Sequence, residues 1–334
     1  MTASLIVPIL LLLVPVFLLF PFAGCVGDDA KLAAAQDAEK KAVEEKKAVE
    51  EKVAKDAADG SAAAAAAAEA AKFENIVKAN TNLVSQWRLG ELETGDVTAK
   101  DSAPTAPLNG AYKFLQGIAR GQAGALTFRD PNDKSAEFRG TEGFVEVPPD
   151  GLRNPPFSFS IELWLLPKGV STQPQVVLSS YELDAAGLVV RGFVLDVLRA
   201  PTLRVRARIG HGTGSTSIEA SLGDGLLHGG WRHVVLTYNG PTKTVMLYVN
   251  ADDGKPDAEL PSPSLPSAVT YAAVAMPTVM PLRIGAGQIE VATAGPGAAA
   301  IGSVGQFFEG RIDEVAVYRT ALDGAEIKKH FLAA

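Results

Sequence analysis

The sequence predicts an all-β protein folded as an antiparallel β-sandwich, and three observations support this prediction. From residue 83 onward, short stretches with alternating apolar residues recur, separated by clusters of Gly, Pro and Asn. Helical periodicity is almost absent from the same region. The clearest pair of strands spans residues 231–250, where Asn239-Gly240-Pro241 predicts the turn of a β-hairpin.

Both arms of this hairpin carry apolar residues on both faces. Val234 and Leu236 alternate with Val235, and the second arm repeats the pattern with Val245 and Leu247. A strand that is apolar on both faces is typical of the interior of a layered β structure. We therefore interpret the hairpin as part of the core scaffold.

The other expected strands are shorter and lie on both sides of the hairpin. They span residues 83–89, 125–128, 136–139, 144–147, 157–166, 176–179, 188–197, 203–209, 215–220, 282–284 and 307–318. The chain closes with Asp323-Gly-Ala-Glu326, a capping box that predicts a short helix extending to about Phe331.

Four blocks of sequence resemble one known family. The hairpin contains a W-x-H-V pattern at Trp231 and His233, the block Phe159-Ser-Ile-Glu-Leu-Trp164 precedes it, and the blocks 282–285 and 308–318 follow it in order. These blocks are similar to those of laminin-G-like, concanavalin A-like jelly rolls. The resemblance implies a jelly-roll sandwich, a fold that hosts lectins, adhesion modules, glycoside hydrolases and inert spacers.

The composition narrows the classes of function. The chain has 334 residues, a formal net charge of −7, four histidines and one cysteine. An acidic chain disfavours nucleic acid as a partner, because phosphate backbones are usually met by a basic face. A single cysteine excludes an internal disulfide.

The amino terminus is expected to direct export and membrane attachment. Residues 1–24 carry no charge and are almost wholly apolar, and they end in Phe22-Ala23-Gly24-Cys25. This ending resembles the lipobox of bacterial lipoproteins, which implies cleavage before Cys25 and lipidation of its thiol. An uncleaved transmembrane anchor is the alternative, since the apolar run exceeds about 18 residues. Either reading predicts an exported, membrane-anchored protein of the bacterial cell envelope, periplasmic or surface-facing.

Residues 25–80 are expected to form a helical stalk. The segment is rich in Ala, Glu and Lys, with seven consecutive alanines at 62–68, and these residues are strong helix formers. The valines keep no heptad spacing, so a semi-rigid spacer is favoured over an oligomerising coiled coil. The jelly-roll domain is then expected to occupy residues 81–334.

One candidate ligand site lies on the strand predicted at 157–166. Phe159, Ile161 and Leu163 share the face that should point between the sheets, which places Glu162 and Trp164 on the opposite face. Jelly-roll lectins often bind their ligand on such a face, where Trp164 could stack on a sugar ring. The alternative is that loops cover the tryptophan and it fills a second apolar layer.

A second candidate site is a row of arginines. Arg204, Arg206 and Arg208 alternate with apolar residues and therefore share one strand face. Three guanidinium groups could hold an anionic glycan by bidentate contacts. The alternative is an ordinary strand face whose charges are offset by neighbours such as Asp196 or Glu219.

The resemblance also implies a structural calcium ion. Related jelly rolls often bind Ca²⁺ through backbone carbonyls and an Asp near the last strand, and Asp313 occupies the matching I-D-E-V position. Calcium requires about six to eight oxygen ligands. Asp130, Asp133, Asp252 and Asp253 could contribute, although Asx turns explain them without a metal.

Catalytic motifs are not found in the sequence. Glycoside hydrolases on this fold carry an E-x-D-x-E arrangement on one strand, whereas Glu162 stands alone and Asp313 and Glu314 are adjacent. We therefore expect a lipid-anchored binding or adhesion module that recognises a glycan or a protein of the envelope or the exterior. The alternatives are a glycoside hydrolase-like enzyme on the same fold and a structural envelope protein without a ligand.

Overall fold

The computed structural model describes most of the region predicted to be β-rich. It covers residues 72–94, 97–168, 171–199, 201–223, 230–250, 255–260, 271–273, 280–290 and 300–334, together with 37, 40–41, 43–49, 51–52 and 55. The expected signal segment at 1–24, Cys25, and Asp252 with Asp253 lie outside the described residues. The chain divides into two compact units, Met1–Ala66 and Ala67–Ala334.

In the first unit, the described residues between 37 and 55 are helical and exposed, as their Ala, Glu and Lys content predicts. Lys47 and Glu51 form an i,i+4 ion pair of 3.9 Å there. Among the helices that the structure describes, none combines the length and the apolar character needed to cross a membrane.

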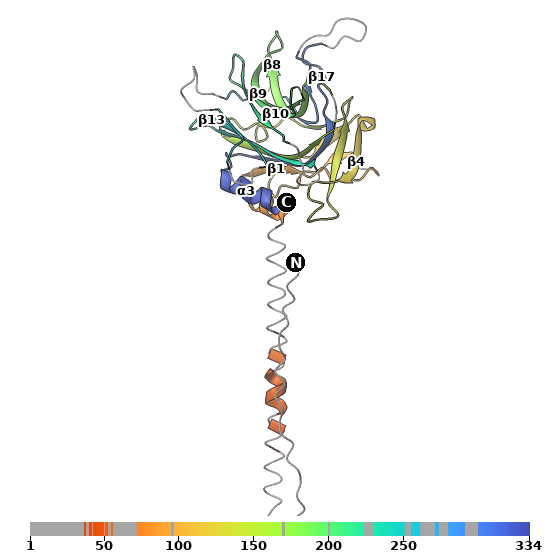
Figure 1. Ribbon diagram of the computed structural model, residues 1–334, viewed down its shortest axis with the longest axis vertical. Helices are drawn as coiled ribbons and strands as arrows, with labels where there is room; N and C mark the ends of the chain where they lie inside the picture. Colours follow the sequence, from red (N-terminus) through yellow and green to blue (C-terminus); the bar gives the residue numbers. More distant parts are fainter. Residues whose placement is uncertain are drawn as a thin grey trace, which may run out of the picture. The chain divides into compact units, whose positions relative to one another are not determined.

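The second unit contains two stacked antiparallel sheets (Figure 1). The hairpin sheet has the order β14-β13-β12-β7-β18-β5-β4, with β1 also pairing with β18. Its strands are β1 (Leu83–Trp87), β4 (Ile118–Ala123), β5 (Lys134–Arg139), β7 (Phe159–Pro167), β12 (Arg232–Asn239), β13 (Thr244–Val249), β14 (Ala258–Leu260) and β18 (Glu309–Tyr318).

The arginine sheet faces it and has the order β11-β10-β9-β8-β15-β6-β3-β2. Its strands are β2 (Thr98–Ala99), β3 (Gly110–Lys113), β6 (Phe144–Val147), β8 (Gln175–Leu183), β9 (Val189–Leu198), β10 (Arg204–Gly210), β11 (Ser215–Ser221) and β15 (Leu282–Ile284). A small pair, β16 (Gly287–Gln288) and β17 (Val304–Gly305), completes the described strands.

The main core lies between the two sheets and is filled by alternate side chains, as the sequence predicts. Val234 and Leu236 of β12 and Ile161 of β7 are fully buried in it. Phe159 of β7 reaches across to Phe193 of β9, with 5.4 Å between the ring centroids. The sandwich prediction is therefore confirmed.

A second apolar layer covers the outer face of the hairpin sheet. Helices α2 (Phe73–Ala79) and α3 (Gly324–Ala333) pack against each other and contribute Phe73 and Phe331 to this layer. Figure 1 shows α3 lying below the sheet that carries β1 and β13. Helix α3 begins as expected, because the Asp323 side chain accepts a hydrogen bond from the Glu326 backbone N–H. Helix α2, which the sequence analysis assigns to the stalk, belongs to the compact unit Ala67–Ala334.

Two local predictions differ from the structure. Residues 125–128 form a turn rather than a strand, because the N–H groups of Ala125 and Leu126 donate to the carboxylates of Asp313 and Asp133 instead of a strand ladder. The hairpin turn lies where expected, but the residue with positive φ is Lys243, at 55°, rather than Asn239 or Gly240.

Candidate functional site

The structure places Glu162 and Trp164 on the outer face of β7, as predicted, but neither side chain is exposed. Both have 0% exposure, since α3 and α2 lie over them. Trp164 stacks on Phe331 of α3, with 6.0 Å between ring centroids and 13° between ring planes. The expectation that these two residues line an open ligand groove is therefore wrong.

Glu162 instead forms the centre of a buried polar network. Its carboxylate lies 2.6 Å from Nε2 of His233 and 2.9 Å from Nδ1 of His330, and it accepts a 2.6 Å hydrogen bond from the Tyr318 hydroxyl. Burial alone would raise the pKa of Glu162, but the facing charge of His330 and the hydrogen bonds from both imidazoles lower it. The network joins β7, β12 and β18 to α3.

The arginine row is occupied by ion pairs. Arg206 makes two 2.9 Å hydrogen bonds to Asp196, and Arg204 pairs with Glu219 on the neighbouring strand. Arg208 makes a bidentate contact with Glu290 at 2.7 and 2.8 Å. Because each guanidinium already has a carboxylate partner, the expectation of an open anion-binding row is wrong.

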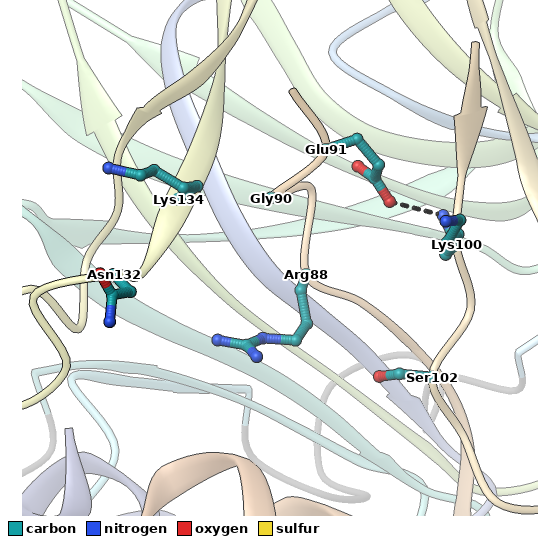
Figure 2. A pocket seen from close by; sticks show the side chains of 7 residues that line it. All are labelled: Arg88, Gly90, Glu91, Lys100, Ser102, Asn132 and Lys134. Carbon is teal, nitrogen blue, oxygen red and sulfur yellow. Dashed lines mark hydrogen bonds between the residues drawn. The ribbon is translucent and has the colours of Figure 1, made fainter. Parts of the chain in front are cut away.

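A different cluster of charged side chains lines a hollow of about 340 Å³. We call it the charged pocket, and Figure 2 shows its lining residues. They come from three separated segments, and they are Arg88, Gly90, Glu91, Lys100, Ser102, Asn132 and Lys134. The first segment follows β1, the second follows β2, and the third leads into β5.

Partnering within the charged pocket is uneven. Glu91 is engaged at both oxygens, by the backbone N–H of Lys100 and by the Tyr112 hydroxyl, each at 2.7 Å. The backbone of Lys134 pairs with that of Ala123, but its side-chain ammonium has no hydrogen-bond or ion-pair partner among the residues that the structure describes. Gly90 allows the two walls to approach, because a Cβ there would lie only 3.2 Å from the carbonyl oxygen of Lys134.

Arg88 connects the charged pocket to a buried acidic cluster. Its Nε donates to Glu314 at 2.7 Å, its Nη1 to Glu74 at 2.8 Å and its Nη2 to Asp133 at 3.2 Å. Asp133, Asp313 and Glu314 are buried, with carboxylate oxygens within 4.8 Å of one another. We call these three residues the acidic cluster.

The three carboxylates of the acidic cluster are opposed by fewer cations, and the pKa values of all three are raised. Burial, with the neighbouring Asp133 and Glu314 carboxylates, raises the pKa of Asp313 well above its usual range. Burial also raises the pKa of Glu314 to about 7, against the opposing effect of Arg88. The pKa of Asp133 is raised by burial as well. Part of the cluster is therefore protonated near neutral pH.

The cluster contains Asp313, the residue at which the family resemblance implies calcium, together with Asp133. The donor set does not fit that ion. All six carboxylate oxygens of the cluster already accept a hydrogen bond, from Arg88, Gln86 or a backbone N–H. Calcium would need about six to eight oxygen ligands at 2.3–2.6 Å, in place of these donors. Calcium binding stays a prediction from the family resemblance.

Sequence reasoning missed the charged pocket. Arg88 follows β1 and Lys134 begins β5, so the two residues are far apart in the sequence and no short motif links them. The one local signal was the charged pair Arg88 and Glu91 on either side of Leu89-Gly90, just after the end of β1.

The fold and the sequence agree on the family. The profile of the Concanavalin A-like lectin/glucanases superfamily, in its laminin G form, matches residues 139–328, which is more than half of the chain. The chain belongs to this family. No curated protein sequence matched the chain.

Several solved structures resemble the chain at low identity. The binding domain of Paraclostridial Mosquitocidal Protein 1 is 15% identical, with a TM-score of 0.48, covering 75% of this chain and 52% of that one. The binding domain of botulinum neurotoxin serotype D/C is also 15% identical, with a TM-score of 0.48, covering 76% of this chain and 52% of that one. Domain 4 of AbnA, a GH43 extracellular arabinanase from Geobacillus stearothermophilus, was solved with arabinotriose. It is 16% identical, with a TM-score of 0.44, covering 75% of this chain and 98% of that one. The chain spans about half the length of the first two.

Proposed function

We propose that the protein is a binding module that holds an acidic glycan, a carboxylate-bearing sugar, in the charged pocket. The family hosts lectins as well as glucanases. The observation that carries the proposal is the uneven partnering of the pocket, where Lys134 has no described partner while both oxygens of Glu91 are occupied. The carboxylate of a sugar could therefore bind the Lys134 ammonium, while the hydrogen bonds to Glu91 already offset the negative charge of that side chain.

The positive charge that the charged pocket offers a ligand comes from Lys134 rather than from Arg88. The Arg88 guanidinium is already opposed by Glu314, Glu74 and Asp133. Three of its five N–H groups are used in these bonds, so the other two remain as oriented donors for a ligand. The side chains of Asn132 and Ser102 line the same hollow and suit sugar hydroxyls (Figure 2).

The geometry favours binding over glycoside hydrolysis. Hydrolysis requires two carboxyl groups facing a sugar at about 5 to 10 Å. The charged pocket and three other hollows on the described surface each have at most one carboxylate in their lining, namely Glu91, Glu146 or Asp323. Glu162, the acid on β7, is sealed under α3.

The experiment compares two trisaccharides that differ in their carboxylates. We expect the full chain to bind trigalacturonic acid and to bind galactotriose much more weakly, as measured by isothermal titration calorimetry. Lys134→Ala should weaken binding of the acidic sugar about tenfold or more, because a charge-assisted hydrogen bond contributes about 1.5–3 kcal/mol.

Lys243→Asn is the matched control. It also removes one positive charge, from an exposed turn outside the pocket, and Asn tolerates the positive φ of that position. Equal losses in the two variants would attribute binding to net charge alone. Equal affinity for both trisaccharides would contradict the proposal.

We further propose that the module is exported and anchored through a lipid on Cys25, with residues 25–80 as a spacer. The support is the uncharged apolar segment 1–24 and the small residues that precede the only cysteine. Expression in a bacterium with labelled palmitate should label the chain, and Cys25→Ser should remove the label. Labelling that persists in Cys25→Ser would contradict this attachment.

A further inference from the structure

The acidic cluster is in contact with a cation from the same chain, the Arg88 guanidinium. We infer that Arg88 is a built-in counter-cation, which occupies the place of a metal ion and makes the fold independent of calcium. The inference concerns the domain itself and does not depend on which ligand the charged pocket binds.

Most carboxylate oxygens of the acidic cluster already accept hydrogen bonds from groups other than Arg88. The two oxygens of Asp313 accept from the backbone N–H groups of Ala125 and Glu314, at 2.8 and 2.9 Å. One oxygen of Asp133 accepts from the Leu126 N–H at 2.7 Å. The second oxygen of Glu314 accepts from the Gln86 side-chain amide at 2.7 Å. These bonds occupy four of the six oxygens, which leaves one oxygen of Asp133 and one of Glu314 for a cation.

Arg88 fills that outer position. Its Nε and Nη2 bridge Glu314 and Asp133, two side chains with no exposure, while 30% of the Arg88 side chain itself remains exposed. The guanidinium therefore lies between the acidic cluster and the solvent of the charged pocket. It supplies the positive charge that a bound metal would otherwise supply.

The backbone at Gly124 is adapted to this arrangement. A Cβ at that position would overlap with Oδ2 of Asp133 and crowd Oδ2 of Asp313. The Gly124 N–H also donates to the carbonyl oxygen of Asp133 at 3.1 Å. The turn 124–133 thus folds tightly over the carboxylates, and the Thr127 hydroxyl takes up the Gly124 carbonyl oxygen that a calcium ion could have used.

The test measures metal binding and thermal stability of the full chain, without any sugar. After gel filtration in calcium buffer, elemental analysis should find far less than one Ca²⁺ per wild-type chain. The melting temperature should be the same in EDTA and in millimolar CaCl₂. Arg88→Met keeps most of the apolar stem and removes the charge, so its melting temperature should fall by about 5 °C or more.

Calcium should then restore part of the loss in Arg88→Met, and the recovery should saturate with concentration. Arg88→Lys, which keeps the charge, should lose less than Arg88→Met and serves if the methionine variant does not fold. Arg319→Met is the matched control, because Arg319 is exposed and bonds only uncharged oxygens of Asn82 and Thr81 in the described structure.

Three results would overturn the inference. They are stoichiometric calcium on the wild-type chain, a wild-type melting temperature that falls in EDTA, and an Arg88→Met variant that is destabilised but unaffected by calcium or magnesium. An Arg88→Met variant as stable as wild type would overturn it as well, since no counter-cation would then be needed.

Discussion

Two buried groups of charges lie at different places on the hairpin sheet, and they respond to burial in opposite ways. Under α3, one carboxylate, Glu162, faces two imidazoles and a phenol, and its pKa falls. In the acidic cluster, Arg88 is the one cation in contact with the three carboxylates, through Asp133 and Glu314, among the described residues, and the pKa of Glu314 rises to about 7. Burial opposes ionisation at both sites, so the number of opposing charges decides the direction of the shift.

The comparison also separates two roles. The Glu162 network joins α3 to strands β7, β12 and β18 inside a closed apolar layer, so it is a structural clamp. The acidic cluster reaches solvent through Arg88 at the charged pocket, so it orients a group that a ligand can touch. Of the two, only the second has the access that recognition requires.

The largest expected effect comes from breaking the first group. Glu162→Gln leaves His330 without its opposing charge in a buried site, and this should lower the free energy of unfolding by about 3–5 kcal/mol. Urea denaturation of the full chain would measure it. Trigalacturonate affinity of the remaining folded protein should not change, because Glu162 lies outside the charged pocket. A loss below about 1 kcal/mol would contradict the clamp.

A smaller effect is expected from pH. The carboxyl groups of Asp313 and Glu314 have raised pKa values, so their contribution to the free energy of unfolding is fully present below about pH 4.5. The contribution of Glu314 is lost as the pH rises through about 7. His330, whose pKa Glu162 raises although burial lowers it, also loses its stabilising contribution as pH rises. Glu162, with a lowered pKa, loses its contribution only as pH falls below about 4.5.

These signs together place the maximum of stability in mildly acidic solution. Between pH 5.5 and 8 the free energy of unfolding should fall by about 1–3 kcal/mol. Asp313→Asn cannot ionise and should flatten the part of the slope that belongs to the acidic cluster. Denaturation at several pH values would measure both slopes, and stability that rises from pH 5.5 to 8 would contradict the charge assignment.

The smallest effect is expected from Tyr318→Phe. This change removes one 2.6 Å hydrogen bond to Glu162 but leaves both imidazoles in place. The cost should be about 1–2 kcal/mol, well below that of Glu162→Gln. Urea denaturation would measure the ratio. Equal costs for the two variants would show that the hydroxyl, rather than the counter-charge of the imidazoles, holds the carboxylate.

The alternation of apolar residues predicted the strands of both sheets, but it did not predict which helices and loops pack over them. Alternation placed Glu162 and Trp164 on the correct face of β7, yet their burial depends on a helix that begins about 160 residues later. Asp196 and Glu219 were named as residues that could offset the charges of the arginine row, and they lie on the strands next to β10. Glu290 was missed because it reaches Arg208 from a distant loop.

The charged pocket could not be predicted for a similar reason. Arg88, Lys100 and Lys134 are brought together by the pairing of strands that are far apart in the chain. Residues 125–128 of the turn were predicted to form a strand because their apolar residues match a strand pattern. Its backbone N–H groups are instead bound by Asp133 and Asp313, and no local pattern records that long-range contact.

The most direct test of the account is a crystal structure of the full chain with trigalacturonic acid. The account predicts electron density in the charged pocket, with a sugar carboxylate within hydrogen-bond distance of the Lys134 ammonium and an Arg88 N–H. Ordered sugar at another site, with the charged pocket filled only by solvent, would contradict it.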